Sequence, residues 1–242
     1  MDIQSFDKMN NHEFNTVKVS DGTELDLYVA VPEGEGSFPG LIVIQEAYGV
    51  NHHIRNVCER FCKEGYAVVS PDIFHRTVRR FDGVYDDFAA VMPHYQAVTN
   101  QNLAADLQAC FDWFQQQDNV VKDKIGSVGY CLGGRVSFLA NTVLPLSAAV
   151  SYYGGRLDQL AGEAGKLNGD HLFFWGGKDA HITQDKVDTI INAVKAAGKN
   201  YTSVTISYAD HAFSCDERPN YHPLAAKEAW AHTLAFFENR LR

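Results

Sequence analysis

The most informative segment of the chain is Ile-Gly-Ser-Val-Gly-Tyr-Cys-Leu-Gly-Gly, at positions 125–134. An apolar run that ends in a glycine-rich turn predicts a buried strand, then a sharp turn and a helix. Cys131 is expected at the tip of that turn. Glycines two residues before and two residues after it let the strand and the helix approach closely around a strained backbone.

A thiol at such a tip is a candidate nucleophile. The turn directs the Cys131 side chain toward the positive end of the following helix, which favours the thiolate. Nucleophile elbows of the form Gly-x-Ser-x-Gly have this layout, with serine at the tip. A structural role is the alternative, because free cysteine is among the most often buried residue types. Other residues must decide between the two interpretations.

Composition predicts an ordinary soluble globular protein with a sizeable core. The chain has 242 residues, of which 45% are hydrophobic and 21% charged, and we expect residues 1–242 to form one domain. The formal charge of −9 argues against nucleic acid as a partner. No apolar run is long enough for a transmembrane helix, so no membrane association is expected. The N-terminal residues lack the basic start and apolar region of a signal peptide.

The cysteines and histidines do not predict a disulfide framework or a metal site. Five cysteines are an odd number and widely spaced, which fits a reducing cytoplasm. Cys58 and Cys62 are interpreted as core residues, because no second pair completes a metal site. His52 and His53 are adjacent and point to different sides of a helix. No nucleotide-binding loop is present, and no cofactor or metal is expected.

Strand and helix patterns alternate along most of the chain. This alternation predicts an α/β fold, with a mostly parallel central sheet and helices on both faces. An antiparallel hairpin around Asp21-Gly22 precedes it. Residues 72–95 are expected to be an irregular excursion near the site, and 162–169 a surface loop. The expected strands are 15–20, 24–31, 41–44, 67–69, 125–128, 148–153, 171–176 and 201–206. The expected helices are 54–63, 101–116, one that follows the elbow at 125–134 and ends near Asn141, 184–197 and 224–239.

Three reactive side chains follow three of these strands. Cys131 follows the strand at 125–128, Asp179 follows that at 171–176, and His211 follows the last one. Sheets of this kind place their sites at the carboxyl ends of the strands. The chain order nucleophile, acid, histidine is that of α/β-hydrolases. We therefore expect Cys131 to attack a carbonyl, His211 to exchange the proton, and Asp179 to fix the imidazole tautomer.

An oxyanion hole is expected beside the nucleophile. Hydrolases of this architecture take one donor from the residue after the nucleophile, here the N–H of Leu132, and one from a loop after an earlier strand. The segment Gln45-Glu46-Ala47 follows the strand at 41–44. By analogy, the N–H of Ala47 is the second donor, and Glu46 points at the site.

Together these segments resemble the dienelactone hydrolase family, a branch of the α/β-hydrolases also described as carboxymethylenebutenolidase-like. The resemblance runs across nearly the whole chain. Cysteine at the elbow, combined with Gln-Glu before the oxyanion loop, is typical of this family rather than of the superfamily. The matching segments are 45–51, Pro71-Asp72-Ile73-Phe74-His75-Arg76, Gly129–Gly134, Ser151-Tyr152-Tyr153-Gly154, Gly176-Gly177-Lys178-Asp179 and His211-Ala212-Phe213.

The resemblance implies further roles. Glu46 would pair with the resting thiol and take its proton when substrate displaces the carboxylate. Arg76 would bind a substrate carboxylate, and Tyr152 would also contact the substrate. The family has a second arginine four residues after the histidine, where this chain has Cys215. Arg218 lies three residues further on and could reach the site instead.

The expected function is therefore a cysteine-dependent hydrolase of a small ester or lactone, acting through a thioacyl-enzyme. A carboxylesterase or thioesterase with a neutral substrate is one alternative. A non-catalytic binding protein on a hydrolase scaffold is another. A thiol redox protein is a third, but no Cys-x-x-Cys supports it. The partner is a small molecule, and the protein is expected to be a monomer or a weak homodimer.

Overall fold

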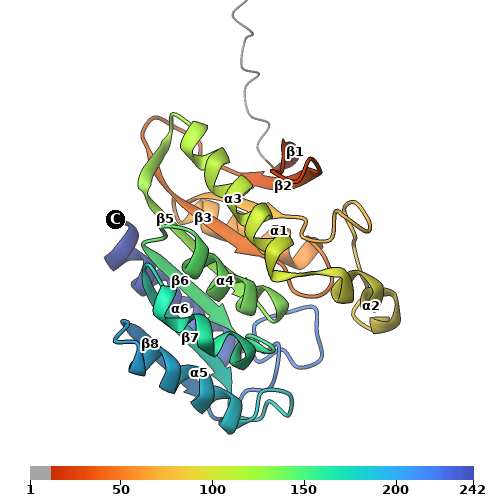
Figure 1. Cartoon of the computed structure of the whole chain (residues 1–242), viewed down its shortest axis with the longest axis vertical. Coiled ribbons are helices and arrows are strands. Elements are labelled where there is room, and N and C mark those ends of the chain that lie inside the picture. Colours follow the sequence, from red (N-terminus) through yellow and green to blue (C-terminus); the bar gives the residue numbers. More distant parts are fainter. Residues whose placement is uncertain (1–11) are drawn as a thin grey trace, which may run out of the picture.

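The computed structural model describes residues 12–242, in which eight strands form one sheet (Figure 1). The strands are β1 (Glu13–Lys18), β2 (Glu24–Ala30), β3 (Phe38–Ile44), β4 (Ala67–Pro71), β5 (Val120–Tyr130), β6 (Ala148–Tyr152), β7 (Asp170–Gly176) and β8 (Tyr201–Ile206). Their order across the sheet is β1-β2-β4-β3-β5-β6-β7-β8. β1 pairs antiparallel with β2, and β2 with β4, whereas all other neighbours are parallel. The expected fold class and N-terminal hairpin are confirmed.

Helices cover both faces of the sheet. They are α1 (His52–Lys63), α2 (Phe88–Ala97), α3 (Asn100–Gln116), α4 (Leu132–Val143), α5 (Gln184–Ala196) and α6 (Pro223–Leu241), with a 3₁₀ segment η1 (Leu157–Lys166). α1 and α6 pack together on one face, where the rings of Phe61 and Trp230 are 4.4 Å apart. α3, α4 and α5 lie on the other face (Figure 1).

Burial explains why the central strands are apolar along their whole length. Leu41, Ile42, Val43 and Ile44 of β3 are all fully buried. A strand covered by helices on both faces has no solvent side, so it shows a continuous apolar run instead of alternation. The parallel strands β3 to β8 end at the same edge of the sheet, which is where the predicted site residues follow them.

Two segments differ from the sequence-based prediction. The excursion expected to be irregular contains α2, whose N-cap Asp87 accepts a hydrogen bond from the N–H of Ala90. Only Val91 of α2 is buried, so the helix lacks the amphipathic pattern by which it could have been predicted. The loop expected at 162–169 is also partly wrong, because η1 extends to Lys166 and buries Leu160 and Ala164.

The strand at 125–128 is longer than predicted. β5 begins at Val120 and shifts its register against β3 between Pro39 and Gly40. Such an irregularity interrupts the pattern of alternation from which a strand is predicted.

Within residues 12–242, none of the helices is both long and apolar enough to span a membrane.

Candidate active site

The turn at Cys131 is a tight strand-to-helix connection. Cys131 has φ 53° and ψ −111°, a conformation that is strained for a non-glycine residue. A Cβ at Gly129 would lie 1.9 Å from the carbonyl oxygen of Gly133, and a Cβ at Gly133 would lie 2.3 Å from that of Ile44. The glycines are therefore required by close backbone approach. The turn presents Cys131, half-buried, at the N-terminus of α4.

Cys131, His211 and Asp179 form a continuous row of polar contacts. The Sγ atom of Cys131 lies 3.2 Å from Nε2 of His211, and Nδ1 of His211 lies 2.7 Å from Oδ2 of Asp179. The other carboxylate oxygen of Asp179 accepts hydrogen bonds from the backbone N–H groups of His181 and Ile182, at 2.8 and 3.0 Å. The three residues that the sequence placed at separate strand ends thus meet at one point.

The electrostatics of this row favour a charged pair. Burial acts to lower the pKa of His211, but the adjacent Cys131 and Asp179 outweigh it and raise that pKa to about 10. Burial acts to raise the pKa of Asp179, but the hydrogen bond and charge of His211 bring the net shift below its usual value. A protonated His211, held between Cys131 and the carboxylate of Asp179, is consistent with both directions.

Two backbone N–H groups are free beside the thiol. Leu132 is the first residue of α4, so its N–H has no partner within the helix. Neither Leu132 nor Ala47 donates a backbone hydrogen bond to another residue of the 12–242 region. The loop after β3 is anchored by Gln45, which accepts from the N–H of Ile73 at 3.3 Å and donates to the carbonyl of Glu46 at 3.3 Å.

Glu46 is placed differently from the expectation. It is 1% exposed, and neither carboxylate oxygen has a hydrogen-bond partner among the described residues. The expected contact between Glu46 and the resting thiol is therefore not formed, because Cys131 is paired with His211 instead. The negative charge of Glu46 acts on its surroundings. After burial, it is the largest cause that raises the pKa of Cys215, to about 12.

Two residues expected to bind substrate lie elsewhere. The guanidinium of Arg76 makes two hydrogen bonds to Asp106, at 2.9 and 2.8 Å, and another to Asp21 at 2.9 Å. Tyr152 is 1% exposed, and its hydroxyl lies 2.6 Å from Oγ1 of Thr233 in α6. Neither lines the cavity at Cys131, so both expectations are corrected.

Arg218 does reach the site. It lines a cavity of about 490 Å³ together with Cys131 and His211. Its guanidinium carbon lies 5.6 Å from the ring centres of both Tyr48 and Tyr85. Burial acts to lower the pKa of Arg218, but Glu46 and neighbouring groups raise it above its usual value, so the side chain is a permanent cation.

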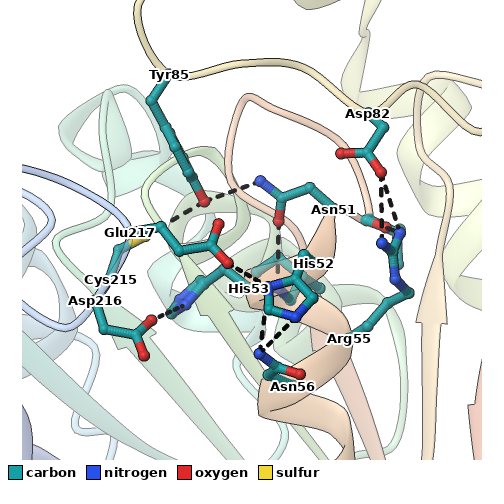
Figure 2. Close-up of polar contacts among 12 residues, drawn as sticks. Asn51, His52, His53, Arg55, Asn56, Asp82, Tyr85, Cys215, Asp216 and Glu217 are labelled. Atoms are coloured by element: carbon teal, nitrogen blue, oxygen red, sulfur yellow. Dashed lines mark hydrogen bonds and ion pairs between the residues drawn. The ribbon is translucent and has the colours of Figure 1, made fainter.

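The loop that carries Arg218 is attached to the N-terminus of α1 (Figure 2). Nδ1 of His53 lies 3.0 Å from Oδ1 of Asp216, and Nδ1 of His52 lies 2.5 Å from Oε1 of Glu217. Cys215 donates to the hydroxyl of Tyr85 at 3.3 Å. The neighbouring histidines, which the sequence had only excluded as a metal pair, thus fasten the loop on which His211 and Arg218 stand.

Sequence reasoning missed the aromatic wall of the cavity. Tyr48, Phe88 and Tyr95 line it, and so does Arg156, which follows β6. The mixture of aromatic and basic residues at 72–95 was the available signal. Among the described residues there is no group of three or more His, Cys, Asp or Glu side chains that could hold a metal ion.

Comparisons with known proteins identify the family of this chain. The model of the dienelactone hydrolase family matches residues 25–241. A protein assigned as a carboxymethylenebutenolidase from Synechocystis sp. is 32% identical over 225 residues, covering 89% of this chain and 92% of the relative. One from Escherichia coli K12 is also 32% identical, covering 90% of this chain and 84% of the relative.

Solved structures give the same result. A protein assigned as a dienelactone hydrolase from Klebsiella pneumoniae matches with a TM-score of 0.83 and 32% identity, covering 93% of this chain and 98% of that one. A dienelactone hydrolase-like promiscuous phosphotriesterase from metagenomic libraries matches with a TM-score of 0.82 at 21% identity, covering 95% and 99%, which shows a shared fold. The chain belongs to the dienelactone hydrolase family, whose members hydrolyse ester or lactone bonds.

Proposed function

We propose that this member of the dienelactone hydrolase family hydrolyses a small ester or lactone with Cys131 as the nucleophile. The observation that carries the proposal is the row from Cys131 Sγ to His211 Nε2, at 3.2 Å, and from His211 Nδ1 to Asp179 Oδ2, at 2.7 Å. A nucleophile, a base and a group that orients the base are within contact distance of one another, at the wall of a cavity. A protein that only binds ligands has no need of this arrangement.

The first half of the reaction forms a thioacyl-enzyme. The Cys131 thiolate attacks the carbonyl carbon, and the carbonyl oxygen becomes an oxyanion that the N–H groups of Leu132 and Ala47 can stabilise. When the tetrahedral intermediate collapses, the bond from carbon to the alcohol oxygen breaks. Protonated His211 gives its proton to that oxygen. In a lactone the alcohol stays attached to the acyl group, because the ring opens.

The second half releases the acid. Water attacks the thioester carbon and gives a proton to His211, which became neutral in the first half. Collapse of the second intermediate breaks the bond from carbon to sulfur and restores the thiolate and the imidazolium. Asp179 keeps Nδ1 protonated throughout, so that Nε2 is the atom that exchanges protons.

We keep Glu46 in the proposed site as a proton acceptor that acts only when substrate is bound. In the free protein His211, not Glu46, contacts the thiol. A buried carboxylate without hydrogen bonds is energetically costly, so a substrate that moves Glu46 toward a donor relieves that cost. This role applies to enzyme molecules in which the Cys131 thiol is still protonated and His211 has not taken its proton.

All five cysteines are free thiols. Because the proposed nucleophile must stay reduced, we propose the cytoplasm as the place of action.

The proposal is tested by comparing wild type with Cys131→Ala on a panel of lactones, aryl esters and thioesters. Cys62→Ala is the control, because it removes a different thiol. A slowly hydrolysed member of the panel is used to trap the acyl-enzyme. We expect turnover to disappear only in Cys131→Ala, and mass spectrometry to find the acyl group on Cys131. Hydrolysis by Cys131→Ala at the wild-type rate would exclude Cys131 as the nucleophile.

A further inference from the structure

The cavity at Cys131 carries a one-sided set of charges. Its lining includes Arg156, Lys186 and Arg218, and no aspartate or glutamate lines it among the described residues. This is unusual in a chain with 30 acidic and 21 basic residues. Clefts lined by one sign of charge concentrate ligands of the opposite sign.

The two arginines stand at different ends of a row of aromatic rings. Arg218 lies 5.6 Å from the ring centre of Tyr48. The ring of Phe88 is 6.3 Å from that of Tyr48 and 6.5 Å from that of Tyr95. Arg156 lies 5.3 Å from the ring centre of Tyr95. The row Tyr48, Phe88, Tyr95 therefore separates an inner cation, half-buried Arg218, from an outer one, exposed Arg156.

Both guanidinium groups are without a carboxylate partner in the 12–242 region. Arginines elsewhere in the fold, such as Arg76 and Arg240, form close ion pairs with aspartates. Arg218 and Arg156 form no ion pair and donate no side-chain hydrogen bond; their described contacts are with aromatic rings. Their donors are thus free to bind an anion through two parallel hydrogen bonds.

The outer cation is held in place at an energetic cost. Arg156 has φ 59°, in the left-handed region that is unfavourable for a residue with a side chain. The preceding residue, Gly155, donates its N–H to the carbonyl of Cys131 at 3.2 Å. The strained segment therefore lies directly against the nucleophile turn.

Cys131 lines the same cavity as the two cations. The Gly155 hydrogen bond connects the Cys131 turn to the segment that carries Arg156. A substrate whose carbonyl reaches Sγ therefore occupies the cavity that Arg218 and Arg156 also line.

We propose that the preferred substrate carries two anionic groups, one on each side of the ester bond. Arg218 binds the inner group, and Arg156 binds the outer one. A flat portion between them lies against the aromatic row. This inference rests on the proposed function, since it names the substrate class of the same site.

A set of four esters tests it. The dianion is the hydrogen succinate ester of 4-hydroxybenzoate, which has one carboxylate in the acyl part and one in the alcohol part. The two monoanions carry a methyl ester at one end or the other, and the neutral compound carries both. Release of the hydroxybenzoate product is followed by absorbance. The enzymes are wild type, Arg218→Gln, Arg156→Gln and, as a matched control outside the cavity, Arg60→Gln.

For wild type we expect kcat/KM to rise by about tenfold to a hundredfold for each carboxylate added, which is the usual gain from a charge-assisted hydrogen-bond pair. Arg218→Gln should abolish the preference for one carboxylate, and Arg156→Gln the preference for the other. Arg60→Gln should keep both preferences. Matching thermal unfolding curves for all variants exclude misfolding as the cause of a loss.

Other outcomes overturn the inference. If one arginine variant removes both preferences, the site binds a single anion and the inference of two anionic groups fails. If wild type hydrolyses the dianion no faster than the neutral ester, while Cys131→Ala is inactive, the inference fails and the proposed function stands. If Cys131→Ala hydrolyses the four esters as well as wild type does, the proposed function itself fails.

Discussion

Replacing Asp179 by asparagine tests whether Asp179 fixes the tautomer of His211. One oxygen of Asp179 accepts hydrogen bonds from the N–H groups of His181 and Ile182, and the other faces His211 at 2.7 Å. Asparagine has only one oxygen. Two N–H donors cannot face an NH₂ group, so that oxygen must take the position beside the backbone. The NH₂ group then points at Nδ1 of His211.

This arrangement selects the wrong tautomer. An NH₂ donor makes Nδ1 an acceptor and moves the ring proton to Nε2, which faces Cys131 at 3.2 Å. His211 can then no longer take a proton from the thiol. By analogy with serine triads, kcat should fall by about 10⁴, equivalent to about 5.5 kcal/mol of activation free energy. KM should change little, because Asp179 does not line the cavity.

Steady-state kinetics on an aryl ester and the rate of thiol alkylation provide two readouts. Both should fall in Asp179→Asn, since both depend on the Cys131 thiolate. The control is Asp185→Asn, an exposed carboxylate at the start of α5. A combined Asp179→Asn and His211→Ala variant should be no worse than the more impaired single variant, because the residues act as one unit. If Asp179→Asn kept more than a tenth of the wild-type kcat, the tautomer argument would be refuted.

Protonation, packing and the glutamate beside the site offer four more tests. The pKa of His211 is raised to about 10, so kcat/KM should stay level through pH 8–9. Above about pH 10 it should fall, because the leaving group loses its proton donor. A fall centred below pH 8 would contradict this. Burial lowers the pKa of His171 to about 3 from 6.5, so the folded state binds fewer protons than the unfolded state, and stability is lost as pH falls below 6.5. At pH 5 this costs about 2 kcal/mol, and urea unfolding of His171→Gln should lack that acid loss. Gly133→Ala should destabilise by about 3 kcal/mol or more, whereas Gly155→Ala, where a Cβ has nothing within 4 Å, should unfold near the wild-type midpoint. Glu46→Gln should lower kcat about tenfold with little change in thermal stability, and an unchanged kcat would remove Glu46 from the proton path.

The sequence predicts the sheet and the reactive strand ends well because their signals are local. The elbow glycines, the apolar run of β3 and the chain order of Cys131, Asp179 and His211 each depend on short segments. A parallel sheet then brings the carboxyl ends of its strands to one edge without any further information. Long-range pairing need not be known to predict that these side chains converge.

The substrate residues were harder to predict because they depend on the direction of a side chain. Tyr152 is the last residue of β6, and Tyr153 lies beyond the strand with φ 37°, so the two side chains diverge. Tyr152 points toward Thr233 in α6, whereas the ring of its neighbour Tyr153 lies 5.1 Å from that of His211. A motif that contains both tyrosines does not say which one faces the site. The guanidinium of Arg76 instead binds Asp106, a partner 30 residues away that no local sequence pattern reveals.

Arg218 brings a cation to the site although Cys215 stands where the family resemblance implies an arginine. Cys215 is buried and donates to the hydroxyl of Tyr85 at 3.3 Å. The N–H of Arg218 donates to the carbonyl of Cys215 at 3.1 Å, which closes a turn and brings the guanidinium to 5.6 Å from the ring of the same tyrosine. Positions 215 and 218 thus contact one side chain from two directions. A cation at either position can stand beside Tyr85, so the absence of arginine at 215 does not by itself predict a neutral substrate. What decides the charge of the cavity is the path of the loop, which His52 and His53 hold against Glu217 and Asp216.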